Sequence, residues 1–596
     1  MTNKPPAPKA PPTTIQEIIH RFEEGAWVKW FKLGTGLLVL IALTAWYDLR
    51  EYKNFGAPEA MEAAQLGRNL SRGEGFNTQV VRPFGIHLVD EKQGVQSRLS
   101  KKPHPDIYQA PVYPLFLAGL MKVLPFKFGI GAGFWRYQPE FLIALVNQAL
   151  FFLNVFLCCM LARRLFDNAV AVALAILLLG CEVMWGYSCS GLSTMLIFLF
   201  LNGLIWAMVR MEAGTREEGR TTAWYAGWAV VAGVCLGAAT LTRYSVGWLV
   251  FPVLLYGFWY LGARRALVCG IVAGLFFLLL APWMWRNFQA CGSPLGVAGY
   301  AVMEDTLQFP GTTLERMIVP DFNKLTLDDI FRKLLVNGGA ILQGDLPRLG
   351  GSWITAFFLV GLLFPFRSIA LSRLRWWTLW SLAIFVVVQA LGRTYLSTLS
   401  PTYNSENVLV LLLPWVFMFG TGFFFVLLDQ MELPFMEARR YVVMLFLGVG
   451  CSSLVLLLLP PRSYPMVYPP YLPTWIHEAS GFMTKREVIM TDAPWAVAWY
   501  GDRTAIWNTL DVRRSFYTIN DEHKGISAVF LTPLTTDQRF LTQILRGQEG
   551  EWGALAVEAL IKTNLPPRFP LQDARLAYAP DHLLLCDRPR WREKAR

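Results

Sequence analysis

The feature that most constrains this chain is a long series of apolar runs, most of them close to the length that a helix needs to cross a bilayer. Examples are LGTGLLVLIALTAWY at 33–47 and ALVCGIVAGLFFLLLAPW at 266–283. Of the 596 residues, 54% are hydrophobic and only 16% are charged, which excludes a soluble globular protein. The sequence therefore predicts an all-α polytopic membrane bundle of about 11–13 transmembrane helices.

The later apolar runs set the expected positions of the other helices. They fall at about 111–125, 141–161, 169–187, 191–209, 223–241, 245–261, 266–284, 352–366, 376–392, 407–428 and 441–460. The run at 111–125 has prolines near both ends and a lysine within it. It is short for a full span, so we expect it to be re-entrant or interfacial. We therefore favour eleven crossings, or thirteen if further broken segments cross.

Basic residues occupy every second connection between the runs, which predicts their side of the membrane. They gather at 163–164, 210–220, 264–265, 367–375 and 439–440. The positive-inside rule makes these connections cytoplasmic. The loop at 48–110 and the chain after 460 are then extracytoplasmic. The formal net charge of +11 is thereby explained by topology and contacts with lipid headgroups, without nucleic acid.

Both ends of the chain differ in composition from the apolar middle. We expect residues 1–32 to form a cytoplasmic tail with an interfacial amphipathic helix, residues 33–460 the transmembrane domain, and residues 461–596 an external domain. No small-residue cleavage site follows the first run, so we expect a retained helix. The nine cysteines do not form a disulfide framework, and no metal-ligand spacing is present. The sequence thus indicates no divalent cation.

Residues 461–596 predict a small C-terminal α/β domain. A Pro/Tyr-rich linker at 460–475 precedes apolar segments at 486–492, 524–533 and 581–587, which we expect to be strands. Helical patterns at 537–545 and 552–563 alternate with them. The domain has no Gly-rich phosphate loop and no nucleophile elbow, which favours a structural or acceptor-docking role.

The first external loop carries the strongest candidate for chemistry. Its segment 57–76 has helix-forming composition, and Gly73 and Gly75 predict its end. Glu59 and Glu62 are three residues apart and share one helix face. Two interpretations stay open. Both glutamates are solvated on a surface helix, or the helix presents a carboxylate to a lipid-linked substrate.

Several segments, taken in order, resemble a known family. They are the acidic loop helix, the segment Ala110–Leu115, ARRLF at 162–166, LTRY at 241–244 and APWMWRNFQACGSP at 281–294. DAPWAVAWYGDRTAIW at 492–507 adds a C-terminal likeness. This order resembles the bacterial membrane glycosyltransferases of the GT-C fold, relatives of the dolichyl-phosphate-mannose protein mannosyltransferases and the aminoarabinose transferases of lipid A. The likeness covers most of the chain, and order and spacing carry it.

The resemblance implies an inverting transferase in the bacterial cytoplasmic (inner) membrane. Such enzymes move a sugar from a polyprenyl-phosphate donor to a lipid, glycan or protein acceptor on the extracytoplasmic face. Glu59 falls where the family has an aspartate, and it would be the general base. Arg243 and Arg286, at the LTR and RN positions, would bind the phosphate, with Tyr244 beside them. Asp48 is the strongest rival base, because it directly follows the first span.

The sequence also departs from the family pattern. Ser193 and Thr194 stand where the family has a second acidic residue, and we expect Glu182, near the outer end of a span, to replace it. Asn407 stands where the family has an arginine. A non-catalytic scaffold or lipid-binding subunit of the same fold therefore stays open, with Arg243 and Arg286 as interfacial anchors. A transporter is less favoured, because no inverted repeat is visible.

Overall fold

The structure is a computed structural model that describes residues 26–590 with gaps. The gaps are 53, 95–97, 132–135, 218, 352, 365, 367, 433–435, 461–471, 537–549, 560–564, 566–568, 572–573 and 577–581. The chain forms two compact units, one of residues 1–52 with 458–460 and the other of 53–457 with 461–596. Helix α2 (Ala26–Arg50) of the first unit covers the predicted first span. Most of the predicted interfacial helix at 14–31, the predicted helix at 537–545 and most of the linker lie outside the described residues.

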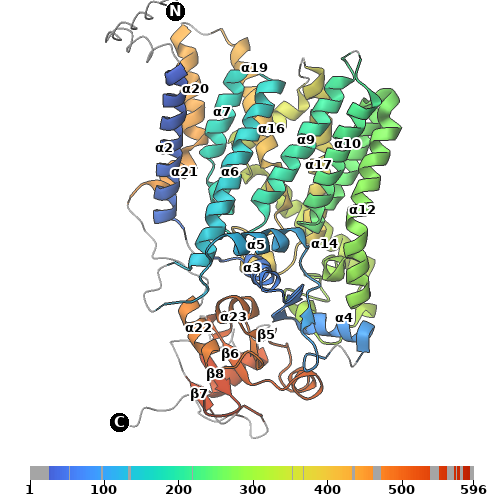
Figure 1. Ribbon diagram of the computed structural model, residues 1–596, viewed down its shortest axis with the longest axis vertical. Coiled ribbons are helices and arrows are strands. Elements are labelled where there is room, and N and C mark those ends of the chain that lie inside the picture. Colours follow the sequence, from blue (N-terminus) through green and yellow to red (C-terminus); the bar gives the residue numbers. More distant parts are fainter. Residues whose placement is uncertain are drawn as a thin grey trace, which may run out of the picture. The chain divides into compact units, whose positions relative to one another are not determined.

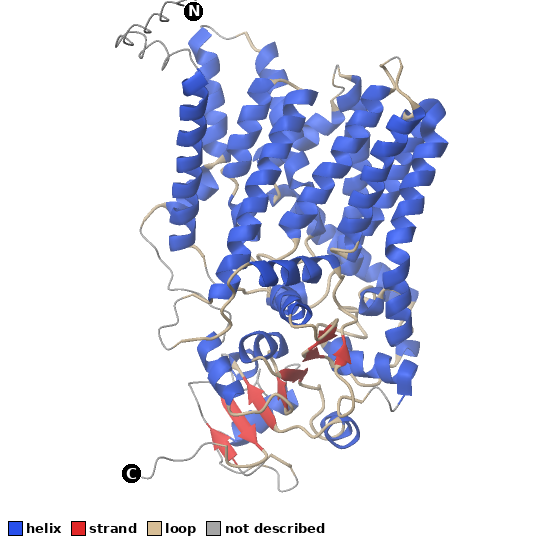
Figure 2. Ribbon diagram, in the orientation of Figure 1, coloured by secondary structure: helices blue, strands red, loops and turns tan. Residues whose placement is uncertain are grey.

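The second unit contains a bundle of long helices (Figures 1 and 2). Each predicted apolar run after the first corresponds to a helix or to a pair of helices. The bundle helices are α6 (Gln138–Leu165), α7 (Asn168–Leu179), α8 (Glu182–Cys189), α9 (Thr194–Gly214), α10 (Thr222–Thr240), α11 (Val250–Tyr260), α12 (Arg265–Cys291), α16 (Trp353–Leu363), α17 (Ile369–Gly392), α19 (Leu413–Gln430), α20 (Met436–Gly450) and α21 (Ser452–Leu458).

The helices confirm an integral, multi-pass membrane protein. Among the described residues, 7 helices are long and apolar enough to cross a membrane, or up to 10 if each bent pair is one span. One such pair is α7 with α8, which meet at 55°. An eleventh crossing would need the shorter segment Tyr244–Tyr260, so that number stays a prediction. Helix α5 (Val112–Val123) has 12 residues and is too short to cross, as expected for the run at 111–125.

A buried ion cluster joins two of the basic connections at one end of the bundle. Glu212 on α9 is fully buried. Its carboxylate binds Arg216 at 2.5 Å and Arg373 of α17 at 2.8 Å. The connections at 210–220 and 367–375 therefore lie on the same side, as the charge pattern predicts.

Helix α3 (Pro58–Ser71) is the element that positions the candidate site. Pro58 occupies its first turn, where a missing N–H costs nothing. The helix ends before Gly73, whose φ of 79° is the left-handed conformation that glycine adopts without strain. Gly67 allows close contact with α5, because a Cβ there would lie 2.8 Å from the Leu117 Cβ. The predicted helix and its end are confirmed. Figure 1 shows α3 between the bundle and the C-terminal strands.

The C-terminal region forms a mixed sheet, which confirms the predicted strands in a smaller α/β region. Three strands, β4 (Val488–Thr491), β6 (Ala528–Leu531) and β8 (Leu583–Cys586), match the predicted ones. The spatial order is β2-β5-β4-β6-β8-β7, in which β2, β5, β4 and β6 are parallel and the other two pairings are antiparallel. The remaining members are β5 (Thr504–Trp507), β7 (Ala574–Leu576) and β2 (Val80–Val81).

Strand β2 links the first external loop to this sheet. It lies just after α3 in sequence and pairs in parallel with β5, with Val80 opposite Ala505 and Val81 opposite Ile506. Val80 and Val81 are fully buried. An apolar core beneath the sheet therefore combines Val81 and Ile86 of the loop with residues from four C-terminal strands. The loop and the C-terminal region share one hydrophobic core, so the sheet fixes the loop that carries α3.

Candidate active site

Glu59 begins α3, and only one of its carboxylate oxygens forms hydrogen bonds. The residue is 8% exposed. The Ser405 backbone N–H and hydroxyl donate to Glu59 Oε1 at 3.1 and 2.8 Å. Oε2 is buried and has no hydrogen-bond partner among the described residues. Burial raises the pKa of Glu59 above its usual value. The interpretation of a solvated surface glutamate is wrong for Glu59, because its side chain is buried.

Arg243 lies near Glu59 and forms no ion pair with any carboxylate among the described residues. Its Nη2 donates to the hydroxyls of Ser193 at 3.4 Å and Thr194 at 3.2 Å, and its buried Nε has no partner. It interacts electrostatically with Glu59 and with Tyr187. A poorly paired guanidinium is costly inside a protein and fits a phosphate in two-pronged geometry. Ser193 and Thr194, where an acid was expected, are the partners of Arg243.

The other two candidates, Glu182 and Asn407, lie on α8 and in the segment 393–407. The Tyr187 hydroxyl donates to the Asn404 carbonyl at 3.3 Å, and its ring lies 5.3 Å from the Tyr403 ring. Asn407 donates its backbone N–H to Asn404 Oδ1 at 2.9 Å, while its own Oδ1 is buried and accepts no hydrogen bond from any described residue. Glu182 is half-buried and interacts with Tyr403. Both candidates thus reach the segment that holds Ser405.

Glu62, one turn after Glu59, takes part in a closed network around Arg82. Arg82 Nη2 lies 2.6 Å from Glu62 Oε1, and its Nε lies 3.1 Å from Glu315 Oε2. The guanidinium carbon is 4.1 Å from the Tyr108 ring centre, and the Tyr395 hydroxyl accepts from Nη2 at 3.3 Å. Burial alone would lower the pKa of Arg82, but the Glu62 and Glu315 carboxylates together with Tyr395 and Tyr108 outweigh it, and the pKa rises. Glu62 is therefore committed to an internal partner.

Glu304 and Glu315 extend this network. Burial raises the pKa of both carboxyls, and the proximity of the two groups raises that of Glu304 further. Lys333 donates from Nζ to the backbone carbonyl of Ala301 at 2.9 Å and to that of Glu304. The segment 301–316 is thus fixed on one side by Arg82 and on the other by Lys333.

Arg286 and Tyr244 form a separate cluster at the end of α12. Arg286 donates to the backbone carbonyls of Asp106 and, at 3.1 Å, of Phe76. Its guanidinium carbon lies 4.9 Å from the Trp283 ring centre. The Trp283 indole N–H donates to the Tyr244 hydroxyl at 2.6 Å. These contacts give Arg286 a role in fixing the first external loop, and phosphate binding by Arg286 stays a prediction.

The far end of α3 is fastened to the C-terminal domain by Arg68. The side chain is 1% exposed and donates to the carbonyls of Trp499 at 2.8 Å and Ala498 at 2.6 Å. Its Nη2 also lies 3.1 Å from Asp502 Oδ1. Although burial opposes it, Arg68 with Arg72 lowers the pKa of Asp502 to about 2. These contacts therefore attach α3, the helix that carries Glu59, to the C-terminal region.

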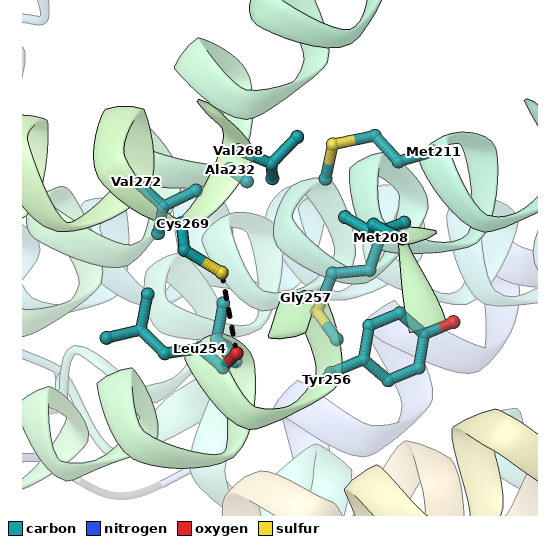
Figure 3. Close-up of a pocket in the computed structure, with 11 residues that line it drawn as sticks. Met208, Met211, Ala232, Leu254, Tyr256, Gly257, Val268, Cys269 and Val272 are labelled. Atoms are coloured by element: carbon teal, nitrogen blue, oxygen red, sulfur yellow. Dashed lines mark hydrogen bonds between the residues drawn. The ribbon is translucent and has the colours of Figure 1, made fainter. Parts of the chain in front are cut away.

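A small pocket within the bundle has a different character. Figure 3 shows it among α9, α10, α11 and α12, with side chains that are almost entirely apolar. Its lining includes Met208, Met211, Leu254, Tyr256 and Val272. It lacks converging charged groups, so we do not place the chemistry there. Among the described residues, no group of three or more His, Cys, Asp or Glu side chains could hold a metal ion.

Sequence reasoning missed Ser405, Arg82 and Glu315. Ser405 lies in sequence SPTYNSEN, where nothing marks one serine among several polar residues. Arg82 follows a two-residue strand, too short for any periodicity. Glu315 is 233 positions from Arg82 in sequence, and only the fold brings them together. Glu59 and Arg243, by contrast, were found by their place in the family pattern.

Solved structures similar to this chain are known. No family model matches the sequence, and no curated protein matches it. A crystal structure of the oligosaccharyltransferase of Archaeoglobus fulgidus is similar, with a TM-score of 0.51 and 12% identity over 86% of this chain and 70% of that one. The same enzyme, AglB, in complex with an inhibitory peptide and a dolichol-phosphate, has a TM-score of 0.51 and 11% identity over 88% and 72%.

A second solved protein is more distant. ArnT from Cupriavidus metallidurans has a TM-score of 0.36 and 12% identity over 93% of this chain and 98% of that one. At 11–12% identity, the two oligosaccharyltransferase structures establish the fold alone. The architecture expected from the resemblance, a helical GT-C-type membrane bundle with a smaller α/β region, is confirmed.

Proposed function

Because the chain has the GT-C fold of the archaeal oligosaccharyltransferase, we propose that it is a membrane glycosyltransferase. It takes a sugar from a polyprenyl-phosphate donor and transfers it to a lipid, glycan or protein acceptor on the extracytoplasmic face. The similar archaeal enzyme was solved with a dolichol-phosphate, which supports a lipid-phosphate ligand. The observation that carries the proposal is a buried carboxylate oxygen, Glu59 Oε2, that has no hydrogen-bond partner among the described residues. Beside it lies Arg243, which interacts with Glu59 and donates to two hydroxyls but forms no ion pair within the described part of the chain.

The two groups suit the two halves of an inverting transfer. The acceptor oxygen forms a bond to the anomeric carbon of the sugar while its proton passes to the Glu59 carboxylate. The bond between the anomeric carbon and the phosphate oxygen breaks, and polyprenyl phosphate leaves with the electron pair. Arg243 would hold that phosphate, because its planar fork stabilises the developing negative charge. The Ser405 donors fix the carboxylate through Oε1 and leave Oε2 for the proton.

We propose supporting roles for the remaining candidates. Asn407 bonds to the segment that carries Ser405 and Glu182 interacts with it, so we propose that they shape the acceptor side. Arg286 and Tyr244 form a separate cluster with the aromatic rings of Trp283 and Phe76, which we propose contacts the donor. Aromatic faces suit contact with an isoprenoid chain or a sugar ring. The external face and the inner-membrane location are part of the proposal.

The direct test uses the purified full-length protein in lipid nanodiscs. It is incubated with a panel of polyprenyl-phosphate sugars, and loss of the sugar from the donor is followed by mass spectrometry. We expect turnover of at least one donor when acceptor lipids or peptides are present. If every donor binds and none is consumed, the alternative of a lipid-binding subunit with this fold replaces the proposal.

A further inference from the structure

Helix α14 (Leu327–Ala340) buries polar side chains and exposes apolar ones, which is the opposite of a surface helix on a soluble protein. It begins with Thr326 and Asp329, which cap each other reciprocally. Asp329 and Lys333 lie on the buried face. The exposed face carries Leu327 at 86%, Phe331 at 57% and Leu335 at 59% exposure. In water this arrangement would leave a large apolar stripe solvated.

The exposed stripe has the pattern of a helix that lies along a bilayer surface. Leu327, Phe331 and Leu335 recur every four residues and so form one line along the helix. Asp328 and Arg332, also exposed, form a parallel charged line one residue further round. A membrane-surface helix places its apolar line on acyl chains and its charged line among the headgroups. The helix continues through a π-helical turn at Ile341–Asp345 to α15 (Leu346–Arg348). Its first two turns carry Asp328, Asp329, Arg332 and Lys333, which are costly inside the hydrocarbon layer and favour a surface position over a crossing.

The stripe is continuous with the surface of the bundle. The Asn337 side chain donates to the Ala390 carbonyl of α17 at 3.0 Å, near the end of that span. Val387, one turn back on α17, is 45% exposed. The apolar surface continues beyond α14 at Leu342, which is 53% exposed, before the chain turns by 108° into α16.

The inward face of α14 is fully occupied, so the helix cannot rotate to hide its stripe. Lys333 is 5% exposed, and its Nζ binds the carbonyls of Ala301 and Glu304. Turning the helix would break these bonds and bury apolar side chains against polar ones. The stripe must therefore meet something apolar beyond the residues that the structure describes.

We propose that α14 is an interfacial helix that rests on the bilayer at the end of the bundle near α5 (Figure 1). The partner is the lipid surface itself. The stripe continues into the outward face of a span, and the charged side chains of Asp328 and Arg332 beside it can reach the lipid headgroups. This placement goes beyond the proposed transferase activity and does not depend on it.

The test is photo-crosslinking of the full-length protein in nanodiscs of phosphatidylethanolamine and phosphatidylglycerol in equal parts. Phe331 or Leu335 is replaced by the photoreactive benzoylphenylalanine, and adducts are identified by mass spectrometry. Phe277 on α12, which is 61% exposed in a span, is the positive control. Lys485 of the C-terminal domain, whose side chain is 71% exposed, is the negative control.

We expect lipid adducts at Phe331 and Leu335 within about twofold of those at Phe277, and none above background at Lys485. Lipid adducts at Phe277 alone would overturn the proposal. Crosslinks from Phe331 to a second copy of the chain would also overturn it, because they would make the stripe a protein interface. None of these readouts requires a substrate, so they stand apart from the test of transferase activity.

Discussion

Glu59 and Glu62 lie one turn apart on α3, and the structure surrounds them in opposite ways. Glu62 is 2% exposed and forms an ion pair with Arg82, which in turn binds Glu315. Glu59 is buried beside Arg243 but forms no ion pair with it, and one of its oxygens has no hydrogen-bond partner within the described part of the chain. A charge with an internal partner holds the fold, whereas a buried charge left without one points to a ligand that supplies the partner. On one helix, the comparison thus separates a carboxylate that is paired inside the fold from the carboxylate that we propose is catalytic.

The largest expected effect is on catalysis at Glu59. Glu59→Gln preserves the side-chain size and the bonds to Ser405 but removes the proton acceptor. A positioned general base contributes about 10²–10⁴-fold, so we expect the transfer rate to fall by that factor while donor binding is retained. The matched control is Asp48→Asn, which should transfer at the wild-type rate. A wild-type rate in Glu59→Gln would remove the distinction between the two glutamates.

The next effect is on stability at Arg82. Arg82→Ala removes the common partner of Glu62 and Glu315 and leaves two carboxylates buried together. Breaking a buried ion pair from one side costs about 3–5 kcal/mol, so we expect a marked fall in the thermal unfolding midpoint in detergent. Arg332→Ala, on the exposed charged line of α14, should leave the midpoint unchanged. An unchanged midpoint in Arg82→Ala would mean that the network does not hold the fold.

The two arginines provide the third contrast, in donor binding. Arg243→Ala should weaken binding of a polyprenyl-phosphate donor by about 10–100-fold, because a charged hydrogen-bond donor contributes about 1.5–3 kcal/mol. Arg243→Lys should recover part of this loss, since lysine lacks the planar fork. Arg286→Ala should change donor affinity less, because its guanidinium is already engaged by two backbone carbonyls. Equal losses in both alanine variants would place the phosphate between the two arginines.

Much of the architecture could be predicted from the sequence, because bilayer physics is local. Each apolar run, the helix at 58–71 and three of the C-terminal strands follow from composition, periodicity and glycine positions. The pairing of the first external loop with the C-terminal sheet could not be predicted, because β2 has two residues and its partner β5 is more than 400 positions away. Ser405 and Arg82 depend on the same long-range folding. The helix at 58–71 follows from local sequence, whereas the position of the first external loop is set by contacts with residues far away in the chain.

The smallest expected effect concerns pH. Transfer needs the ionised Glu59, and burial raises its pKa, so the rate should rise with pH through a value above the usual one for glutamate. Ser405→Ala removes a hydrogen bond that favours the ionised carboxylate, which should move this limb of the profile to higher pH. Ser452→Ala, which removes a hydroxyl that donates to the Val449 carbonyl on α20, should leave it in place. The measurement is the initial rate across a pH series for the three proteins.

The most direct test of the account measures both properties on both glutamates of α3. Glu59→Gln and Glu62→Gln are purified in parallel, and each is assayed for its thermal unfolding midpoint and for sugar transfer per folded molecule. The account predicts a crossed result. Glu59→Gln keeps its midpoint and loses transfer, and Glu62→Gln loses several degrees of midpoint while its folded fraction still transfers sugar. Loss of transfer in Glu62→Gln with an unchanged midpoint, beside an active Glu59→Gln, would contradict the account.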